Sequence, residues 1–510
     1  MSAGSAMPLE RLLAEAGLEL VAGGNCGPGV EIVGLADDSR RVTPGSLFIV
    51  RPGAGGRDAL EFVAPAMERG AVALAVPTEM ASDARVLGAN VPVVRYEDRP
   101  ESIAAMADAF WGSPASAMRM VGITGTNGKT TIAFLYQQLA RAAGRRCGLL
   151  GTVSIDDGVH VRESTLTTPG RLELTSLFAS MRSNVCDDVA MEVSSHALAQ
   201  GRVAGLKFDT AIFTNLTGDH LDFHGSMEEY ASAKAGLFKS LAPGATAVVN
   251  ADDPAHRRML RDCPARVLRC SLEHRDTECF AQVRSSGVHG LDIAMHGPWG
   301  ILDVPLPLLG RHNAMNALQA VAAAWSQGVR ARSIETALRA CHAPPGRLQN
   351  ASTVDDDIGV YVDYAHTDDA LRNVLAACRP CVPAGSRLVV VFGCGGDRDR
   401  TKRPRMAAAA CELADRVWVT SDNPRTEVPE SIVAEVLSGV PLADLARVSS
   451  DVDRAAAIAA AITGAGAGDL VVIAGKGHEN YQVIGTAKRP FDDRIEAIAA
   501  LRARRAGRGS

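Results

Sequence analysis

A glycine-rich stretch at residues 121–131 has the residue types that bind the phosphates of a nucleoside triphosphate. It reads Val-Gly-Ile-Thr-Gly-Thr-Asn-Gly-Lys-Thr-Thr, close to the pattern of a glycine, four residues and Gly-Lys-Ser/Thr. Gly122 lies one residue too early for a strict match, and Gly125 falls inside the gap. In such a loop the backbone N–H groups cradle phosphates, Lys129 adds a positive charge and Thr130 can hold Mg²⁺. We therefore expect this chain to bind a nucleoside triphosphate.

The segments on either side of this loop support that interpretation. The mostly apolar run 118–124 is typical of a strand, and Ile132, Leu135 and Leu139 follow the loop at helical spacing. A chance glycine turn before a helix is the alternative. The strand before the loop and the helix after it both weigh against that alternative.

Several other polar side chains could take part in a reaction or bind a ligand, but each has an ordinary structural explanation when taken alone. Glu192 ends a largely apolar run and is either a metal ligand or a solvated carboxylate, while His220 and Lys234 would usually be structural. The dense charge run Arg398–Arg405 is either a solvated face or a set of guanidinium groups for a carboxylate or phosphate. Asp422-Asn-Pro-Arg425 is either a proline turn or a small zwitterion site, with Arg425 for a carboxylate and Asp422 for an ammonium.

The composition is that of a soluble globular protein, and 510 residues suffice for about three domains. A net charge of −5 gives no broad surface for nucleic acid or membranes. The first residues lack a signal peptide's basic start and apolar core, and no segment offers about 18 uninterrupted apolar residues for a membrane span. The 11 cysteines are scattered, and the one close pair, Cys378 and Cys381, has no partner set at zinc spacing. We expect reduced thiols in a cytoplasmic protein.

Two breaks divide the chain into the expected domains. A proline-containing stretch at 111–117 precedes the phosphate loop, and His-Ala-Pro-Pro-Gly at 342–346 follows two helix-like segments, 313–328 and 333–341. The expected domains are residues 1–116, 117–345 and 346–510. We expect the basic tail after Leu501 to be disordered.

The second and third domains alternate strand-like runs with helix-length segments, which is typical of an α/β fold with parallel sheets. The expected strands are 188–193, 210–215 and 246–250, followed by 359–363, 388–392, 417–420 and 470–474. Polar and glycine-rich motifs directly follow these strands, and open parallel sheets bind ligands beyond the carboxyl ends of their strands. We therefore expect the active site to lie where the edges of two such sheets face each other.

Taken together, the motifs occur in one fixed order along the chain. After the phosphate loop come Glu192–His196, Asn215–His220, Gly310–Asn316, Pro345–Arg347, Asp363–His366 and Gly475–Glu479. This series resembles the Mur ligase superfamily, ATP-dependent enzymes that form amide bonds in peptidoglycan synthesis. With Asp422–Arg425 the chain is similar to the MurE branch, which adds the third amino acid to UDP-N-acetylmuramoyl-L-alanyl-D-glutamate. The resemblance covers nearly the whole chain and is densest from 118 to 495.

The resemblance implies three domains with separate tasks. Residues 1–116 would bind the UDP end of the substrate, 117–345 would form the central ATPase, and 346–510 would be a Rossmann-like domain that receives the amino acid. In the N-terminal domain the match rests on Asp38-Ser-Arg40 and Pro44–Phe48, where Ser39 matches a uridine-nucleotide contact.

The resemblance also implies roles for individual residues. Lys129, Glu192, His220 and Lys234 would be catalytic. Thr130 and Glu192 would hold one Mg²⁺, and a carbamylated Lys234 with His220 would help to hold a second. ATP would contact Gly125, Thr126, Asn127, Gly128, Lys129, Thr130, Thr131, Asn316, Arg347 and Asp363. The UDP-muramoyl dipeptide would contact Ser39, Thr167, Thr168, Ser194, Gln200 and Arg202.

The identity of the added amino acid depends on Arg425 in this interpretation. Residues that match the amino-acid site are Arg398, Asp422, Asn423, Pro424, Arg425, Gly475 and Glu479. Meso-2,6-diaminopimelate differs from lysine by a second carboxylate, for which arginine offers a planar, bidentate donor. Lysine-adding relatives lack this arginine, and an arginine left unpaired opposite lysine would cost about 2 kcal/mol or more. We therefore expect diaminopimelate.

The alternatives are a lysine-adding MurE, a folylpolyglutamate-type ligase, and a non-catalytic nucleotide-binding scaffold. The presence of Lys129, Glu192, His220 and Lys234 argues against the scaffold. The expected partners are small-molecule substrates alone, with no nucleic acid and no membrane span, and the expected state is a monomer.

Overall fold

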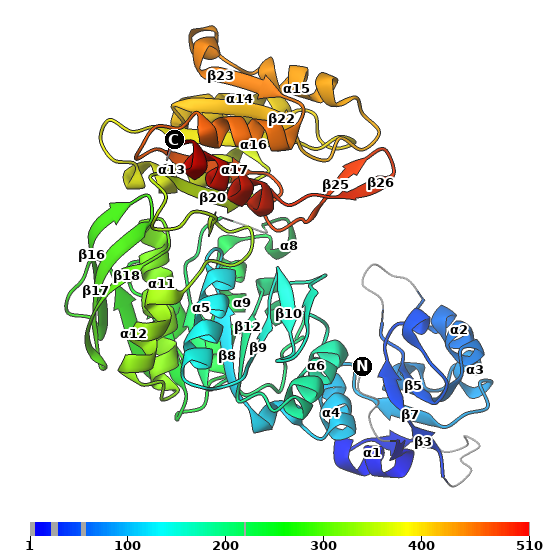
Figure 1. The fold of residues 1–510 in the computed structure, drawn as a ribbon. Helices are drawn as coiled ribbons and strands as arrows, with labels where there is room; N and C mark the ends of the chain where they lie inside the picture. Colours follow the sequence, from blue (N-terminus) through cyan, green and yellow to red (C-terminus); the bar gives the residue numbers. More distant parts are fainter. Residues whose placement is uncertain (1–5, 22–28, 53–57, 219–220, 509–510) are drawn as a thin grey trace. The chain divides into compact units, whose positions relative to one another are not determined.

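The computed structural model describes residues 6–21, 29–52, 58–218 and 221–508 (Figure 1). The chain divides into two compact units. One consists of Met1–Thr126, Gly144–Ala247 and Ala255–Val267, and the other of Asn127–Ala143, Val248–Pro254 and Leu268–Ser510. The strands form three large sheets, and helices alternate with the strands along the chain, which confirms the predicted α/β fold. Among the described residues, no helix combines the length and apolar character needed to cross a membrane.

The N-terminal part is a five-stranded sheet of order β2-β7-β6-β5-β4 with helices on both faces. Leu47 and Ile49 face α1 and α4, while Phe48 and Val50 face α2, as the alternation of a strand requires. Its elements are β1 (Met7–Pro8), α1 (Leu9–Ala16), β2 (Glu19–Leu20), β3 (Glu31–Ile32), β4 (Gly34–Ala36), β5 (Ser46–Ile49), α2 (Val63–Glu68), β6 (Ala71–Pro77), α3 (Ala84–Leu87), β7 (Val93–Tyr96) and α4 (Pro100–Trp111).

The middle sheet has the order β11-β10-β9-β12-β8-β13-β14-β15-β16-β17-β18. Strand β8 (Arg119–Thr124) is parallel to both neighbours, with Glu192 beside Ile123 and Phe213 beside Thr124. The carboxyl ends of β12 and β13 therefore adjoin the end of β8, where the phosphate loop begins. Other elements up to β15 are α5 (Lys129–Ala142), β9 (Cys147–Leu150), β10 (Ser154–Asp156), β11 (Val161–Glu163), α6 (Arg171–Ser183), β12 (Asp188–Glu192), α7 (Ser195–Ala199), β13 (Thr210–Phe213), α8 (Leu221–His224), α9 (Met227–Lys239), β14 (Thr246–Asn250), α10 (His256–Leu260) and β15 (Arg266–Ser271).

An antiparallel meander, which the sequence analysis did not predict, follows β15. It consists of β16 (Cys279–Gly287), β17 (Gly290–Gly297) and β18 (Gly300–Leu306). Helices α11 (Arg311–Ser326) and α12 (Ala331–Ala340) come next, close to the predicted ranges, and both pack against α5. Figure 1 shows the meander in green beside these helices.

The C-terminal part is a six-stranded sheet of order β19-β20-β24-β21-β22-β23. Val390 and Phe392 pack with α13, α14 and α15, while Val389 and Val391 pack with α16 and α17, so helices cover both faces. Its elements are β19 (Gln349–Asn350), β20 (Gly359–Asp363), α13 (Asp368–Cys378), β21 (Leu388–Cys394), α14 (Lys402–Leu413), β22 (Arg416–Ser421), α15 (Pro429–Leu437), β23 (Val448–Asp451), α16 (Arg454–Thr463), β24 (Leu470–Ala474), β25 (Tyr481–Ile484), β26 (Ala487–Pro490) and α17 (Asp493–Arg508).

The prediction of a disordered tail after Leu501 is wrong as far as Arg508. Helix α17 continues through this segment, because its face with Ala497, Ala500 and Leu501 is buried in the C-terminal core. Arg504 donates hydrogen bonds to both carboxylate oxygens of Asp357 at 3.0 and 2.8 Å. The basic residues thus fix the helix to the domain.

Candidate active site

The phosphate loop connects β8 to α5, as predicted, and its geometry requires two of its glycines. Gly125 has φ +145°, and a Cβ there would lie 1.8 Å from Thr214 Oγ1. Gly128 has φ +87°, and a Cβ there would lie 2.6 Å from Asn316 Oδ1. Among the described residues, no side-chain hydrogen bond caps α5 at Gly128. The N-terminus of a helix is suited to bind an anion such as a phosphate.

Helix α9 contacts the first half of this loop. The ammonium of Lys234, which is 1% exposed, donates to the Gly125 carbonyl at 2.9 Å and lies 4.3 Å from the Tyr230 ring centroid. The hydroxyls of Tyr230 and Thr126 are 3.1 Å apart. Lys234 was predicted to be catalytic, and the structure places it directly against the loop. His220 lies outside the described residues.

Glu192 is buried at the carboxyl end of β12. Its two carboxylate oxygens accept hydrogen bonds from the backbone N–H of Thr152 at 2.8 Å and from the Thr152 hydroxyl at 3.0 Å. A Cβ on Gly151 would lie 2.4 Å from Glu192 Oε1, so glycine is needed there. These contacts fix the orientation of the carboxylate while each oxygen keeps a second lone pair for a further ligand.

Five residues predicted to contact the UDP-muramoyl dipeptide form one network with Glu192: Thr167, Thr168, Ser194, Gln200 and Arg202. The Thr168 hydroxyl donates to the Glu192 carbonyl at 2.8 Å and accepts from the Ser194 N–H at 3.0 Å. Arg202 donates to the Thr168 carbonyl at 2.7 Å and to Gln200 Oε1 at 2.9 and 2.6 Å. The hydroxyls of Thr167 and Thr152 are 3.0 Å apart. The structure therefore brings this predicted set together.

Ser39, the sixth predicted contact, is itself buried in a turn of the N-terminal part whose arginines are exposed. Asp38 before it accepts hydrogen bonds from the Arg40 guanidinium and from the Arg40 N–H, and these lower the Asp38 pKa to about 2. The ionised Asp38 thus fixes the turn that presents Ser39.

Three motifs of the predicted series, two assigned to ATP and one to the amino acid, converge at the carboxyl end of β20. The Asp363 carboxylate accepts hydrogen bonds from the N–H groups of Leu348 at 2.7 Å and Ala365 at 2.8 Å, and its carbonyl accepts from Gly475. Burial raises the pKa of Asp363. The Arg347 guanidinium lies 5.9 Å from the Tyr364 ring centroid. The ordered spacing of these motifs in the sequence therefore reflects one spatial cluster.

Arg398 and Arg425 flank the backbone of Gly395, after β21. A Cβ at Gly395 would lie 2.9 Å from Arg425 Nη1 and 3.9 Å from Arg398 Cγ. Arg425 donates through Nη1 to the Gly396 carbonyl at 2.7 Å and has φ +51°. Within the part of the chain that the structure describes, neither arginine forms an ion pair with a carboxylate. Their remaining donors can bind an anionic group.

Acidic and amide groups lie after strands β22 and β24, which flank β21 in the sheet. Asn423 donates through Nδ2 to Glu479 Oε2 at 2.9 Å, and the fully buried Lys476 donates to the same oxygen at 2.9 Å. Burial alone would raise the pKa of Glu479, but the hydrogen bonds from Asn423 and Lys476 lower it below its ordinary value. Gly475 has φ +118°, and a Cβ there would lie 3.5 Å from Asp422 Oδ2. The predicted amino-acid site thus contains cationic and anionic groups.

Two buried arginines that the sequence analysis did not assign support these loops. Arg403 in α14 binds Glu427 through both terminal nitrogens, at 2.9 and 2.8 Å, and donates to the Gly395 carbonyl at 3.2 Å. Arg454 in α16 pairs with the fully buried Asp493 and donates to the carbonyls that end β22 and β24. The sequence analysis considered Arg403 only as part of the charge run Arg398–Arg405, and only the acidic partners farther along the chain could have indicated the role of either arginine.

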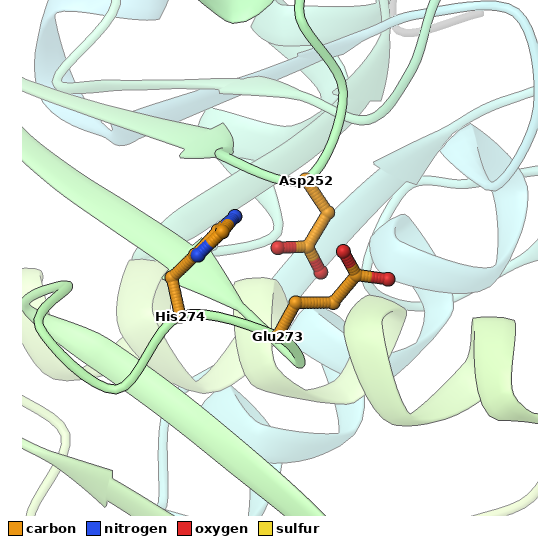
Figure 2. A group of neighbouring side chains, drawn as sticks. All are labelled: Asp252, Glu273 and His274. Carbon is orange, nitrogen blue, oxygen red and sulfur yellow. The ribbon is translucent and has the colours of Figure 1, made fainter.

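A further group of possible metal ligands, Asp252, Glu273 and His274, lies after β14 and β15 (Figure 2). The Asp252 carboxylate already accepts from the Ser271 hydroxyl and, at 2.8 Å, from the Leu272 N–H. Glu273 and His274 are exposed. The hydrogen bonds of Asp252 explain it as a residue that fixes the turn after β15.

Comparisons with known proteins agree with this arrangement. Residues 123–324 match the family model of the Mur ligase middle domain, and residues 346–477 match that of the Mur ligase, glutamate ligase domain. A Gloeobacter violaceus protein named UDP-N-acetylmuramoyl-L-alanyl-D-glutamate--2,6-diaminopimelate ligase is 45% identical over 98% of this chain and 99% of its own length. A protein of the same name from a Synechococcus species is 46% identical over 97% and 99%. A solved structure with this name has a TM-score of 0.74 at 33% identity and covers 98% of this chain and 100% of that one.

Proposed function

Because this chain belongs to the Mur ligase family, we propose that it is an ATP-dependent ligase that adds meso-2,6-diaminopimelate to the side-chain carboxylate of D-glutamate in UDP-N-acetylmuramoyl-L-alanyl-D-glutamate. This reaction belongs to peptidoglycan precursor synthesis. The observation that carries the proposal is the amino-acid site. Arg398 and Arg425, which form no ion pair with a carboxylate of the described residues, lie at one sheet edge. The loops beside them carry the buried Asn423 and the half-buried Glu479, an arrangement suited to a molecule with a terminal carboxylate and a terminal ammonium.

In the first step, an oxygen of the D-glutamate side chain attacks the γ-phosphorus of ATP, ADP leaves, and an acyl phosphate forms. Catalysis of phosphoryl transfer depends on positioning and on charge neutralisation. The N-terminus of α5 would supply N–H groups for the phosphates, and Lys129 would supply a positive charge. In the second step the amine of diaminopimelate attacks the acyl carbon, a tetrahedral intermediate forms and loses a proton, and inorganic phosphate leaves.

The residues assigned to Mg²⁺ have the chemistry that this ion requires. Mg²⁺ prefers carboxylate and hydroxyl oxygens, and Glu192 offers an oriented, buried carboxylate. Thr130 and Glu192 would hold one ion, and Lys234 with His220 would help to hold a second once Lys234 carries a carbamate. Carbamylation replaces the ammonium with an anion, and the ions would supply neutralisation of the phosphate charge. The buried position of Lys234 beside the Gly125 carbonyl supports its assignment to the loop.

The substrates would be divided among the predicted domains. Residues 1–116 would bind the UDP end through Ser39, 117–345 would bind ATP with the additional contacts Asn316, Arg347 and Asp363, and 346–510 would bind the amino acid. The network around Thr168 supports the placement of the muramoyl dipeptide beside Glu192. We propose a monomeric cytoplasmic enzyme that acts on small molecules alone.

Among the alternatives, a lysine-adding ligase would leave Arg425 without a substrate carboxylate to bind. A folylpolyglutamate-type ligase would not need the Asp422–Arg425 site. A non-catalytic scaffold would not need the oriented carboxylate of Glu192. The names of the similar ligases also favour diaminopimelate.

The experiment that tests the function is product mass analysis. Purified protein is incubated with ATP, Mg²⁺, the UDP-muramoyl dipeptide and meso-diaminopimelate. We expect a product heavier than the dipeptide by diaminopimelate less water, together with ADP and phosphate. A reaction mixture in which the dipeptide stays unchanged would refute the proposed ligase.

A further inference from the structure

Lys476 is a fully buried ammonium that the reaction steps above do not use. It lies between β24 and the loop of Glu479 and donates to three side-chain oxygens. These are Glu479 Oε2 at 2.9 Å, Asn423 Oδ1 at 3.2 Å and Asp422 Oδ1 at 3.5 Å. An ammonium has three N–H donors, so this set satisfies all of them. A buried cation without such partners would be strongly destabilising.

These contacts determine how the Asn423 amide is oriented. An ammonium can only donate, so the carbonyl oxygen of Asn423 must face Lys476 and its NH₂ must face Glu479. The N–H of Val483 on β25 also donates to Asn423 Oδ1 at 2.8 Å. Lys476 and the Val483 N–H together fix the amide orientation of Asn423, and Lys476 also holds the Glu479 carboxylate.

The charges around the site lead to the same conclusion. Asp422 and Glu479 are two acidic groups close to Lys476, and without that cation each would lose its direct ion-pair partner at a largely buried position. With Lys476 present, the ammonium partly neutralises the negative charge of Glu479. Its outer oxygen, Oε1, forms no hydrogen bond with any described residue.

We propose that Lys476 is a positioning residue that sets Asn423 and Glu479 for the distal ammonium of the amino-acid substrate. This inference rests on the proposed ligase function. It assigns a role to Lys476, which is not among the residues proposed to contact the substrate. Lys476 acts through Asn423 and Glu479, with which it forms hydrogen bonds. Its loss weakens the binding of diaminopimelate and leaves the ATP half of the reaction intact.

The test is steady-state kinetics of Lys476→Met, a neutral side chain of similar length. We expect KM for diaminopimelate to rise about tenfold or more, because the loss of a single hydrogen bond to a charged group can by itself weaken binding by about that factor. The KM values for ATP and for the UDP-muramoyl dipeptide stay as in the wild type, and kcat at saturating diaminopimelate is largely kept. The control is Lys488→Met, because Lys488 is exposed and lies 3.9 Å from the ring centroid of Tyr481, the same ring that Lys476 approaches at 5.6 Å.

The outcomes separate this inference from the proposed function. Wild-type protein without diaminopimelate-dependent turnover would overturn both, whereas normal wild-type turnover with an unchanged KM in Lys476→Met would overturn the inference alone. An equal loss for all three substrates would show a structural role and would also overturn it. Should the Met variant fail to fold, Lys476→Arg decides. The planar guanidinium keeps the charge but cannot donate to the same three oxygens, so KM for diaminopimelate should still rise, and a wild-type KM would overturn the inference.

Discussion

Replacement of Arg425 tests whether the ligase binds the second carboxylate of its amino-acid substrate. In the structure one terminal nitrogen of Arg425 already donates to the Gly396 carbonyl, at 2.7 Å, and the other donors face no carboxylate of the described chain. In Arg425→Ala the substrate's distal carboxylate loses its bidentate partner. Two charge-assisted hydrogen bonds contribute about 3 kcal/mol together, so kcat/KM for diaminopimelate should fall about 100-fold.

Two further variants refine this prediction. Arg425→Lys keeps a point charge without the planar fork, and we expect it to lose about tenfold in kcat/KM. Ala, Lys and Arg are all disfavoured at φ +51°, so backbone strain is similar in the three proteins. The control is Arg400→Ala, because Arg400 is 62% exposed and pairs with Glu435 away from the proposed substrate.

The assay is phosphate release at varied diaminopimelate, with thermal unfolding of each variant as a check on folding. Arg400→Ala should stay within about twofold of the wild type, as expected of an exposed residue away from the site. The reasoning is refuted if folded Arg425→Ala retains kcat/KM for diaminopimelate within about threefold of the wild type.

Three further predictions concern the framework of the site. Arg454→Met leaves the buried Asp493 unpaired and should lower the free energy of unfolding by about 3–5 kcal/mol in urea titrations, whereas Arg454→Met/Asp493→Leu should recover much of it; equal losses would contradict this. Hydrogen bonds from Arg403 lower the pKa of Glu427 from 4.5 to about 2, so its contribution is complete above pH 4.5 and disappears as pH falls toward 2. Glu427→Gln should therefore be less stable than the wild type at pH 7, with a difference that narrows on acidification; a gap independent of pH would refute the role of the charge. Arg504→Ala removes hydrogen bonds to Asp357 and to three backbone carbonyls and should cost about 1–3 kcal/mol of stability, and unchanged urea unfolding would show that the tail is not fixed.

The fold around the nucleotide loop could be predicted because its signals are local. An apolar run before the loop and apolar residues at helical spacing after it determine β8 and α5, and the structure places these elements within a residue or two of the prediction. The convergence of Asp363, Arg347 and Gly475 could also be predicted, since the carboxyl ends of neighbouring parallel strands lie at one sheet edge.

The buried ion pairs could not be predicted in the same way. Arg403, Arg454 and Lys476 have the residue types of a solvated surface, and only partners distant in the sequence make their burial favourable. The tail after Leu501 was wrongly predicted for the same reason, because the charges of its arginines are compensated by Asp356 and Asp357, well over 100 residues earlier. The antiparallel strands β16–β18 pair by long-range register, which the alternation of short runs does not reveal.

The most direct test of the proposed function compares meso-diaminopimelate with L-lysine as the amino-acid substrate of the wild-type protein. Phosphate release is followed with ATP, Mg²⁺ and the UDP-muramoyl dipeptide, and kcat/KM is measured for each amino acid. Our account predicts release that depends on the amino acid and a preference for diaminopimelate of about 100-fold or more, since lysine leaves Arg425 unpaired. Equal use of lysine, or a preference for it, would contradict the assignment of Arg425 and with it the proposed substrate.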